Sequence, residues 1–428
     1  MKTKKYVINL SLFLLSTAIS LLLAEFAARQ VLNPSDYLGV GMVSDDILGA
    51  VPSKTAKAGF DAWGFRNPDV PKSADIVAVG DSHTFGNTAR MSESWPYVLA
   101  QLSGKHVYNM GMGGYGPNQY FYLSTTKALT LKPRMIVWGL YMGDDFENAY
   151  TITYGLDHWA YLRGQPVSKV DFDIWEKPQS TGWFKNARVW LSEHSILYQL
   201  TFHGGWGGRV QGEMQIRNAA QLYPGEATSV SVPEKNILEA FRPKGMLSRL
   251  DQQSPAVQEG MRITFELLKQ MNAICQQNHV QFMVVVIPIK EAVFSGYLEH
   301  NPKLPLSEVL DRLLENERLA RAKTFKFLGD SGIAYADPLP ALRNAAERQL
   351  YARTAADMHP GKNGYKVIAE AVFEAYKKVP ITGSLNIAPR ADSTNARLHA
   401  HANKAHMQRS RFQNPDVAEE RQRIGAAN

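Results

Sequence analysis

The sequence predicts an α/β protein with a mainly parallel sheet, preceded by an N-terminal transmembrane helix. Two patterns lead to this fold class. A charge-free apolar run covers residues 6–24, directly after a group of lysines. Further along the chain, short runs rich in Val, Ile and other apolar residues alternate with segments whose apolar residues recur every three or four positions. Such alternation is typical of repeated βαβ units, which build parallel sheets.

The first thirty residues predict a membrane anchor or a signal. Lys2, Lys4 and Lys5 precede the apolar run, and basic residues at this place favour a cytoplasmic N-terminus. The run lies at the short end of what crosses a bilayer. A cleaved signal peptide is the alternative, because Ala24 and Ala28 offer small residues near its end. We favour an uncleaved anchor, since the run exceeds the apolar core of an ordinary signal peptide and continues into a helical pattern, AEFAARQVL.

Five later segments are predicted as strands. They lack regular polar alternation, so we expect both faces of the sheet to be covered by helices. The five segments are residues 74–80, 105–111, 134–141, 280–288 and the shorter 333–337. Helical patterns lie between them, including residues 316–328 and the series Met261, Phe265, Leu268, Met271 and Cys275.

Two stretches interrupt this rhythm within a domain expected over residues 31–380. Residues 146–250 show no clear βαβ unit and hold five of the eight tryptophans. These rings are interpreted first as the filling of a small accessory core, and second as a lid or side wall on which sugars stack. A shorter insertion covers residues 292–305. Residues 381–428 are polar and lack hydrophobic periodicity, which predicts a disordered tail with solvated histidines.

Composition argues against several classes of protein. The single cysteine, Cys275, cannot form an internal disulfide, and its place in an apolar helical pattern predicts a buried structural thiol. The net charge of +7 is modest, and the basic residues are spread without the pattern of a nucleic-acid surface, so no nucleic acid is expected as a partner. No His, Asp and Glu residues have the spacing of metal ligands, and neither a metal nor a cofactor is expected.

The motif that carries chemistry is VAVGDSHTFG, at residues 77–86. A buried strand that breaks at Gly-Asp-Ser places the hydroxyl of Ser82 at the sheet edge, where a nucleophile is expected. An acyl-transferring serine also needs a base and a carboxylate that orients the base. The best base is His359, which stands before a Pro-Gly loop, and Asp357 lies two residues earlier. Oxyanion donors are expected among the amides near Ser82 and in the glycine-rich turn NMGMGGYGPN.

At these residues the sequence resembles the SGNH hydrolases, also called the GDSL esterase/lipase family. GDSHTFG is similar to the first block of the family, with Ser82 as nucleophile, and NMGMGGYG to the second, with Gly114 as oxyanion glycine. GLYMGDDFEN is similar to the third block, and DMHPGKNGY to the last, with Asp357 and His359 as acid and base. The resemblance extends from about residue 75 to 376, outside the insertions, and implies a three-layer α/β/α, flavodoxin-like fold.

One position departs from the pattern of the family. Its third block usually reads Gly-x-Asn-Asp, and here Asp144 takes the place of the asparagine that completes the oxyanion hole with Ser82 and Gly114. An ionised aspartate accepts hydrogen bonds without donating any, and the loss of one oxyanion donor typically costs about a hundred- to a thousandfold in rate. Asp144 could be protonated in a dry site, Asn148 or another amide could substitute, or the enzyme could be slow or inactive.

The final block also differs, because it reads Asp-x-His where many hydrolytic members have Asp-x-x-His. This shorter spacing resembles members that work on bacterial polysaccharides, so it does not count against catalysis.

Simpler interpretations exist for several of these residues. Asp81 or Ser82 could serve only as a helix cap. His83 is interpreted as a packing residue or a substrate contact, because adjacent residues cannot easily aim at each other. Asp145 and Glu147 could form the carboxylate pair of a glycosidase, but no second carboxylate at a strand end supports that idea.

The resemblance implies a serine esterase that acts on ester-linked acyl groups, with O-acetyl groups of an extracytoplasmic glycan as expected substrate. The expected partners are an acylated carbohydrate or other ester, and the membrane through the N-terminal helix. The chain is then a single-pass inner-membrane protein whose catalytic domain faces the periplasm. An O-acyltransferase that uses the same serine stays open, since water and a sugar hydroxyl differ only as acceptors. A non-catalytic polysaccharide-binding or assembly factor is the third possibility.

Overall fold

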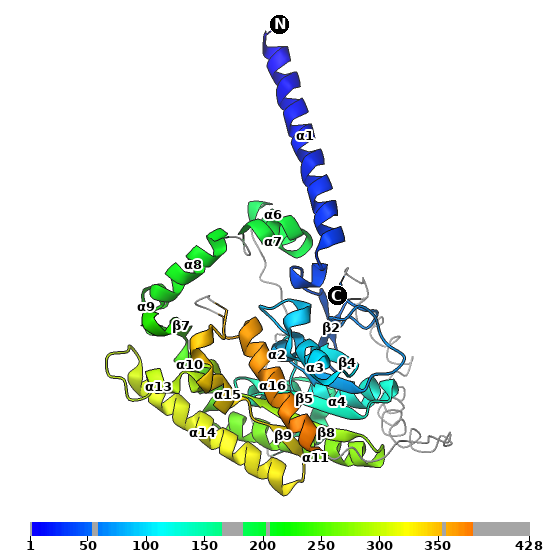
Figure 1. Ribbon diagram of the computed structural model, residues 1–428, viewed down its shortest axis with the longest axis vertical. Helices are drawn as coiled ribbons and strands as arrows, with labels where there is room; N and C mark the ends of the chain where they lie inside the picture. Colours follow the sequence, from blue (N-terminus) through cyan, green and yellow to red (C-terminus); the bar gives the residue numbers. More distant parts are fainter. Residues whose placement is uncertain (1, 54–58, 165–182, 203–205, 353–356, 380–428) are drawn as a thin grey trace, which may run out of the picture. The chain divides into compact units, whose positions relative to one another are not determined.

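A five-stranded parallel sheet forms the centre of the structure, in the strand order β4-β3-β5-β8-β9 (Figure 1). The structure is a computed structural model that describes residues 2–53, 59–164, 183–202, 206–352 and 357–379. The strands are β3 (Ile76–Gly80), β4 (Val107–Gly111), β5 (Met135–Tyr141), β8 (Gln281–Ile287) and β9 (Ala334–Ala336). Each lies inside a predicted segment, so the five strand predictions are confirmed. Counted along the chain, the order is 2-1-3-4-5, that of flavodoxin-like folds.

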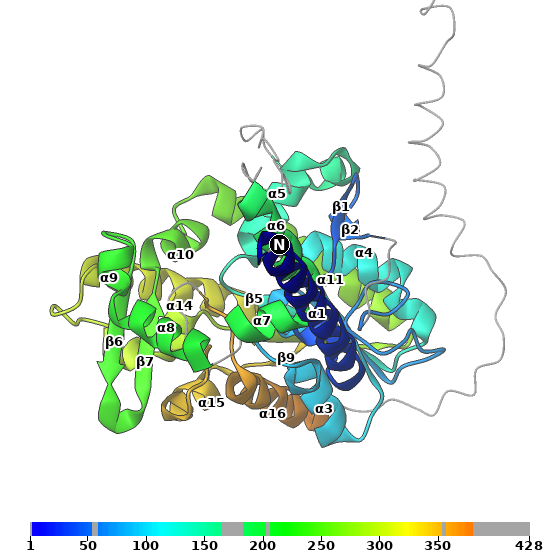
Figure 2. The same cartoon turned by 90° about the horizontal axis from the view of Figure 1, so that it is seen from above.

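Helices cover both faces of this sheet, as its largely buried central strands require. One layer holds α3 (Trp95–Ser103) and α16 (Lys362–Lys378). The opposite layer holds α4 (Pro117–Thr126), α5 (Asp145–Gly155) and α11 (Pro255–Gln277). Figure 2 shows α3 and α16 on one side of the strands and α4 and α5 on the other. The predicted three-layer α/β/α arrangement is therefore confirmed.

The sequence of α11 explains how it packs in its layer. Buried residues such as Met261, Leu268 and Cys275 recur at the spacing of one helix face. At Gly260 a side chain would collide with the carbonyl group of Phe146, so only glycine lets α11 approach α5 this closely. Burial raises the pKa of the Cys275 thiol to about 12, which agrees with the predicted structural role of this cysteine.

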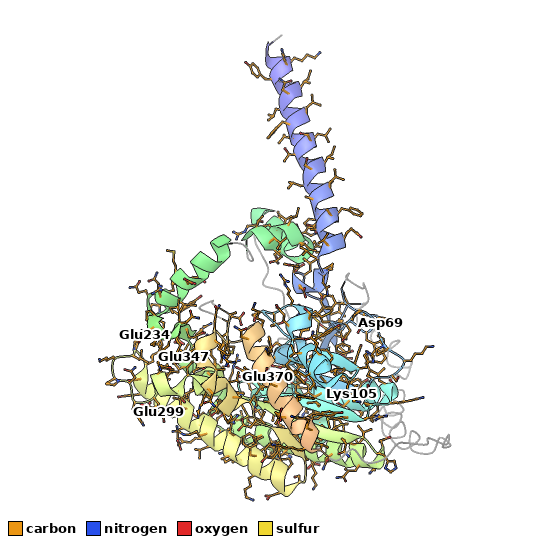
Figure 3. The ribbon with its side chains drawn as sticks, viewed as in Figure 1. Asp69, Lys105, Glu234, Glu299, Glu347 and Glu370 are labelled. Carbon is orange, nitrogen blue, oxygen red and sulfur yellow. The ribbon has the colours of Figure 1, made fainter. Side chains whose placement is uncertain are left out.

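Helix α16, in the other layer, also buries one face and exposes the other. Its Tyr365, Ile368 and Val372 side chains are buried, while Glu370 is exposed, and Figure 3 labels it among the charged side chains outside the core. The tyrosine hydroxyl donates a 3.0 Å hydrogen bond to the carbonyl of Asn87, which ties α16 to the loop after β3.

The apolar run near the N-terminus lies in one long helix, α1 (Lys2–Val31). Residues Lys4–Val31 have a mean hydropathy of 2.2 in their most apolar part, and their large apolar side chains are exposed. By length and composition this helix is able to cross a membrane or to act as a signal anchor. It is followed by a small antiparallel hairpin, β1 (Met42–Asp45) and β2 (Gly49–Pro52), which the sequence patterns did not predict.

The long insertion is mainly helical and also contains an antiparallel hairpin, β6 (Thr228–Val232) with β7 (Ile237–Phe241). Its helices are α6 (Trp183–His194), α7 (Ile196–Phe202), α8 (Trp206–Arg217), α9 (Ala219–Leu222) and α10 (Pro243–Leu250). A small second core is present, formed by Ile216, Ala219, Ala227, Leu238 and Ala240.

Neither of the two tryptophans of the insertion whose side chains the structure describes lies in this second core, where the sequence suggested such rings. Trp159 is buried in the main core, and Trp190 is 59% exposed. The accessory core is aliphatic because the hairpin and the short helices approach each other through alanine and small apolar side chains.

The other described elements are short connections, apart from α14, which contains the helix predicted over residues 316–328. They are α2 (Ser82–Phe85), α12 (Lys290–Val293), α13 (Ser295–Leu298), α14 (Ser307–Asp330) and α15 (Leu339–Asn344), with 3-10 helices at Pro34–Asp36, Met91–Glu93, Ala128–Leu131, Asp157–Leu162, Pro233–Lys235 and Ala346–Arg348. The short insertion predicted at residues 292–305 coincides with α13 and its flanking loops. The tail predicted to be disordered lies outside the described residues.

Candidate active site

The carboxyl ends of three adjacent strands carry the residues that the sequence singled out. Ser82 follows β3, Gly114 lies in the turn after β4, and Asp144 follows β5. Because the three strands are parallel neighbours, their carboxyl ends meet at one edge of the sheet. The strand order reverses at β3, and in open α/β sheets such a switch point is where ligands bind.

A tight turn after β3 presents Ser82. Asp81 caps α2, because its Oδ1 accepts a 2.9 Å hydrogen bond from the backbone N–H of His83. Gly80 leaves no room for a side chain, which would collide with Thr84, and Gly86 ends the helix in a left-handed conformation with φ +87°. The cap interpretation is thus confirmed for Asp81. The Ser82 hydroxyl makes only a long contact of 3.4 Å with Asp81 Oδ2 and has a second, closer partner.

That partner is His359, which the loop before α16 brings to the same edge of the sheet. The distance from His359 Nε2 to Ser82 Oγ is 2.7 Å, and the distance from His359 Nδ1 to Asp357 Oδ1 is also 2.7 Å. The backbone N–H of His359 donates a further 2.8 Å hydrogen bond to Asp357 Oδ1. The structure therefore brings together the three residues that the sequence proposed as nucleophile, base and acid.

The pKa shifts of this pair follow from its contacts. Burial lowers the pKa of His359, but the hydrogen bond and charge of Asp357, with the carboxylates of Asp81 and Asp144, outweigh burial and raise this pKa above its usual value. Burial would raise the pKa of Asp357, but the hydrogen bonds and charge of His359 reverse the effect and lower it. Asp357 therefore stays ionised at neutral pH, holds a proton on Nδ1, and leaves Nε2 to accept a proton from Ser82.

His83 is a packing residue beside the hydrogen-bonded row of Asp357, His359 and Ser82. It is buried, its Nδ1 lies 2.9 Å from Asp81 Oδ2, and its ring stacks on Tyr141 with 3.7 Å between centroids. Burial lowers the pKa of His83, which favours a neutral ring. The ring centroids of His83 and His359 are 4.8 Å apart, so His83 supports the proposed base from one side.

The glycine-rich turn after β4 lies against the nucleophile. A Cβ placed on Gly113 would be 3.9 Å from the Cβ of Ser82, and Gly114 has a φ of +78°. Only glycine adopts this conformation without strain. The turn therefore passes directly beside Ser82, and its assignment as an oxyanion donor through Gly114 stays a prediction.

Asp144 occupies an unusual position in the site. Its side chain is 25% exposed, yet its Oδ1 is buried and accepts no hydrogen bond from the part of the chain that the structure describes. Burial and the nearby charge of Asp81 raise the pKa of Asp144 to about 7, although Arg249 and His359 act in the opposite direction. A guanidinium nitrogen of Arg249 lies 4.0 Å from Asp144 Oδ2. Near neutral pH this carboxyl group can therefore be protonated, and a protonated carboxyl group donates a hydrogen bond.

Asp145, the next residue, has a structural role. It is fully buried, accepts a 2.8 Å hydrogen bond from the Tyr120 hydroxyl, and accepts a 2.9 Å hydrogen bond from the backbone N–H of Tyr141. Glu147 lies 2.9 Å from Arg249 Nε. The two acids are thus committed to separate partners, which disfavours the glycosidase pair.

A cavity of about 650 Å³ opens over the proposed triad. Sequence reasoning missed five of the residues that line it, namely Asn87, Thr88, Tyr141, Arg249 and Met358. Asn87 and Thr88 follow the nucleophile motif directly, and that position is a signal that could have identified them. Arg249 had no such signal, since α10 belongs to the insertion. Asn148 is not among the lining residues, and its Cβ faces Gly116.

Three acids of the described chain come close enough to suggest a cation site. Asp81, Asp144 and Asp145 have carboxylate oxygens within 4.8 Å of one another. His83 occupies both oxygens of Asp81, and Tyr120 and Tyr141 occupy those of Asp145. Only Asp144 is left to ligate an ion, and one carboxylate is too few for Mg²⁺ or Ca²⁺ without a substrate.

No protein-family model matches the chain, and no curated protein matches it. Solved structures similar to it include a protein of Desulfitobacterium hafniense described as a candidate lipolytic protein of the G-D-S-L family, with 14% identity, 70% of this chain and 98% of that chain covered, and a TM-score of 0.34. A mutant acetylxylan esterase of Geobacillus stearothermophilus has 11% identity, coverages of 74% and 99%, and a TM-score of 0.32. A GDSL-like lipase of Bacteroides thetaiotaomicron has 9% identity, coverages of 71% and 87%, and a TM-score of 0.30. At such low identities and scores, the case for function rests on the geometry of the site.

Proposed function

We propose that the chain is a serine esterase in which Ser82 is the nucleophile, His359 the general base and Asp357 the residue that orients the base. One observation carries this proposal, the hydrogen-bonded line from Asp357 through His359 to Ser82, with 2.7 Å at each step. Acyl transfer by a serine needs this arrangement of nucleophile, base and orienting acid. The resemblance to the SGNH hydrolases leads to the same three residues.

The proposed reaction starts when Ser82 Oγ attacks the carbonyl carbon of an ester and its proton passes to His359 Nε2. The N–H groups of Ser82 and Gly114 stabilise the negative charge that develops on the carbonyl oxygen. The bond to the alcohol then breaks, His359 gives its proton to the leaving alcohol, and the acyl group stays on Ser82. A water molecule attacks this acyl-enzyme, again with His359 as base, and Ser82 and the free acid are released.

In this proposal Asp144 is the third oxyanion donor, as a protonated acid. The pKa of about 7 and the buried, unpartnered Oδ1 support that role. The active form needs His359 neutral, with its proton on Nδ1 and Nε2 free, and Asp144 protonated. Since His359 has a raised pKa, the two requirements overlap only in a narrow range around neutral pH.

We also propose that the ester is an O-acetyl group on a glycan outside the cytoplasm. The lysines at the start of α1 favour a cytoplasmic N-terminus, and the proposal therefore has the sheet domain on the periplasmic side of an inner membrane. The cavity of about 650 Å³ falls within the range of small-molecule sites, so it has room for a sugar ring beside the acyl group.

Turnover of a small ester tests the activity. The full chain, purified in detergent, is expected to release acetate from p-nitrophenyl acetate and from an acetylated oligosaccharide, and Ser82→Ala is expected to stop both. Ser103→Ala removes a hydroxyl that donates to the carbonyl of Leu99 and accepts from the backbone N–H of Lys105, at the end of α3, and it serves as the matched control. A folded chain that hydrolyses neither ester would contradict the proposal.

Reporter fusions test the location. Alkaline phosphatase joined behind Val379 is expected to be active, because this reporter matures only after export, and a cytoplasmic fluorescent reporter at the same place is expected to be dark. The opposite pattern would show that the domain faces the cytoplasm.

A further inference from the structure

The carboxyl-terminal part of α1 is bound to the insertion through Glu25. One carboxylate oxygen of Glu25 accepts a 3.0 Å hydrogen bond from the backbone N–H of Ile196, and the other accepts one of 3.0 Å from Leu197 N–H and one of 2.9 Å from the Ser195 hydroxyl. Arg29 lies 2.9 Å from Glu25 and also donates to the carbonyl of His194 at the end of α6. The junction of α6 and α7 is therefore fastened to α1 by charge-assisted hydrogen bonds.

The sequence of α1 sets the height of this junction. Glu25 is the first charged residue after the uncharged run of residues 6–24. A hydrocarbon core of about 30 Å needs about 20 helical residues, so that run fills it and Glu25 reaches the headgroup layer. Figure 1 shows α6 and α7 at the height of the lower part of α1, and Figure 2 shows α7 beside α1. If α1 crosses the membrane, its bond to α7 holds this helix pair at the same level.

At this level α6 exposes a large apolar side chain. Trp190 of α6 is 59% exposed and stacks on His194, with 5.0 Å between ring centroids. An exposed tryptophan is typical of the boundary between membrane and water, where its ring sits among the headgroups and its N–H stays hydrated.

We propose that α6 and α7 form a membrane-surface element, which lies in the headgroup layer of the bilayer that α1 spans and inserts Trp190 into it. The proposal rests on the proposed role of α1 as an anchor. We choose the lipid surface as the occupant because the exposed Trp190 lies on the helix pair that Glu25 fastens to the end of the membrane span. A second contact with the bilayer holds the sheet domain in one orientation, so that its cavity stays at a fixed height above the membrane.

Single-cysteine labelling of the full chain tests this inference. The native Cys275 is buried with a raised thiol pKa, so a cysteine introduced at an exposed position reacts selectively with an NBD fluorophore. The variants are Trp190→Cys, the control Leu319→Cys on α14, which is 43% exposed, and the reference Leu15→Cys within α1. Each labelled chain is reconstituted into vesicles of phosphatidylcholine and phosphatidylglycerol that contain lipids with a nitroxide in the headgroup or in the acyl chain.

The label at position 190 is expected to be quenched several-fold more by headgroup nitroxides than the label at position 319, and the label at position 15 to be quenched by acyl-chain nitroxides. Glu25→Ala is expected to reduce quenching at position 190 and to leave position 15 unchanged. Equal, weak quenching at positions 190 and 319 beside strong quenching at 15 would overturn the inference and leave the anchor intact. Weak quenching at position 15 would overturn the anchor itself, and the inference with it.

Discussion

The Nε2 atom of His359 lies 2.7 Å from the hydroxyl oxygen of Ser82, although 277 residues separate the two in the chain. Further hydrogen bonds join the same two segments. The Thr88 hydroxyl donates to the carbonyl of Pro360 at 2.8 Å, and the Tyr365 hydroxyl donates to that of Asn87 at 3.0 Å. The nucleophile and the base are therefore held together by their neighbours before any substrate binds, which is the condition for efficient proton transfer.

Removal of either partner is expected to abolish ester turnover. Ser82→Ala removes the nucleophile and His359→Ala removes the base, so each is expected to lower kcat by at least about a thousandfold. Because the residues act as one unit, the double variant is expected to be hardly slower than either single variant. Steady-state kinetics on p-nitrophenyl acetate measures both effects.

A second histidine–aspartate pair provides the control. His300 Nδ1 lies 3.3 Å from Asp311, but its side chain is 82% exposed. His300→Ala is expected to keep full activity. Substantial turnover by Ser82→Ala, or losses that multiply in the double variant, would disprove the assignment.

Asp357→Asn is expected to lower kcat strongly while it preserves the fold. An asparagine donates or accepts at the position of Asp357 without a charge, so it no longer fixes the proton on His359 Nδ1 or stabilises the charged ring. The expected loss is about a thousand- to ten-thousandfold. The pKa of His359 is also expected to fall, since Asp357 is among the groups that raise it. Proton NMR of the histidine ring measures this shift, and an unchanged pKa would contradict the account.

Asp144→Asn is expected to change the pH dependence of the reaction more than its rate at neutral pH. In the native chain, activity is expected to fall as the pH rises above about 7, because Asp144 loses the proton that it donates to the oxyanion. An asparagine donates at every pH, so the variant is expected to keep its activity at pH 9, where the native chain has lost about tenfold or more. The acid limb is expected to move to lower pH, since Asp144 helps to raise the pKa of His359.

The measurement is a pH–rate profile of both proteins on one ester. A fall of about a hundredfold for Asp144→Asn at neutral pH would contradict this role. It would show that the reaction needs the carboxylate itself, as a second base or as an acceptor for a substrate hydroxyl.

Arg249→Gln is expected to move the alkaline limb of the native profile to higher pH. The positive charge of Arg249 lowers the pKa of Asp144, so removal of this charge raises the pKa of Asp144. The substitution also leaves Glu147 without its 2.9 Å partner, and the negative charge of Glu147 raises the pKa of Asp144 further. Arg318→Gln on α14 removes an arginine that pairs with Glu299 and Glu315 far along the chain, and it is the matched control. An alkaline limb that moves to lower pH, or moves equally in both variants, would count against the pairing of Arg249 with Asp144.

Loss of one partner of the buried ion pair Lys290–Glu239 is expected to destabilise the fold strongly, whereas replacement of both partners by apolar residues is expected to destabilise it little. The two charges are 2.6 Å apart and almost fully buried, and Lys290 also lies over the rings of Phe241 and Tyr351. Lys290→Met alone leaves a buried carboxylate and is expected to lower the free energy of unfolding by about 3–5 kcal/mol. The double variant Lys290→Met, Glu239→Leu is expected to recover most of that loss. Guanidinium denaturation in detergent compares the two, and equal losses would show that the charges are not coupled.

Much of the fold was predictable because its local signals agree. Four strands of the sheet are mainly apolar runs that are almost wholly buried, while the short edge strand β9 is partly exposed, and all five were recognised from their lack of polar alternation. The helix over residues 2–31 and the buried thiol on α11 followed from the same kind of pattern. The hairpins β1–β2 and β6–β7 were missed because their strands have only four or five residues each, which is too short for a clear pattern.

The site was predictable in part for a similar reason. Ser82, Asp357 and His359 stand at strand ends or before a helix, where the chain itself suggests chemistry. Arg249 reaches the site from the insertion, and no local pattern shows which sheet edge an insertion covers. Likewise, the raised pKa of Asp144 depends on burial and on the charge of Asp81, which are properties of the folded site.

Reaction with a fluorophosphonate, followed by mass spectrometry of the peptides, tests the central claim most directly. This reagent phosphonylates a serine only where a base has activated its hydroxyl, so the account predicts one adduct, on Ser82, in the folded full-length chain. His359→Ala is expected to prevent the adduct, and His300→Ala to leave it unchanged. A folded chain that forms no adduct, or forms it on another serine, would contradict the claim that Ser82 and His359 are the nucleophile and base of an esterase.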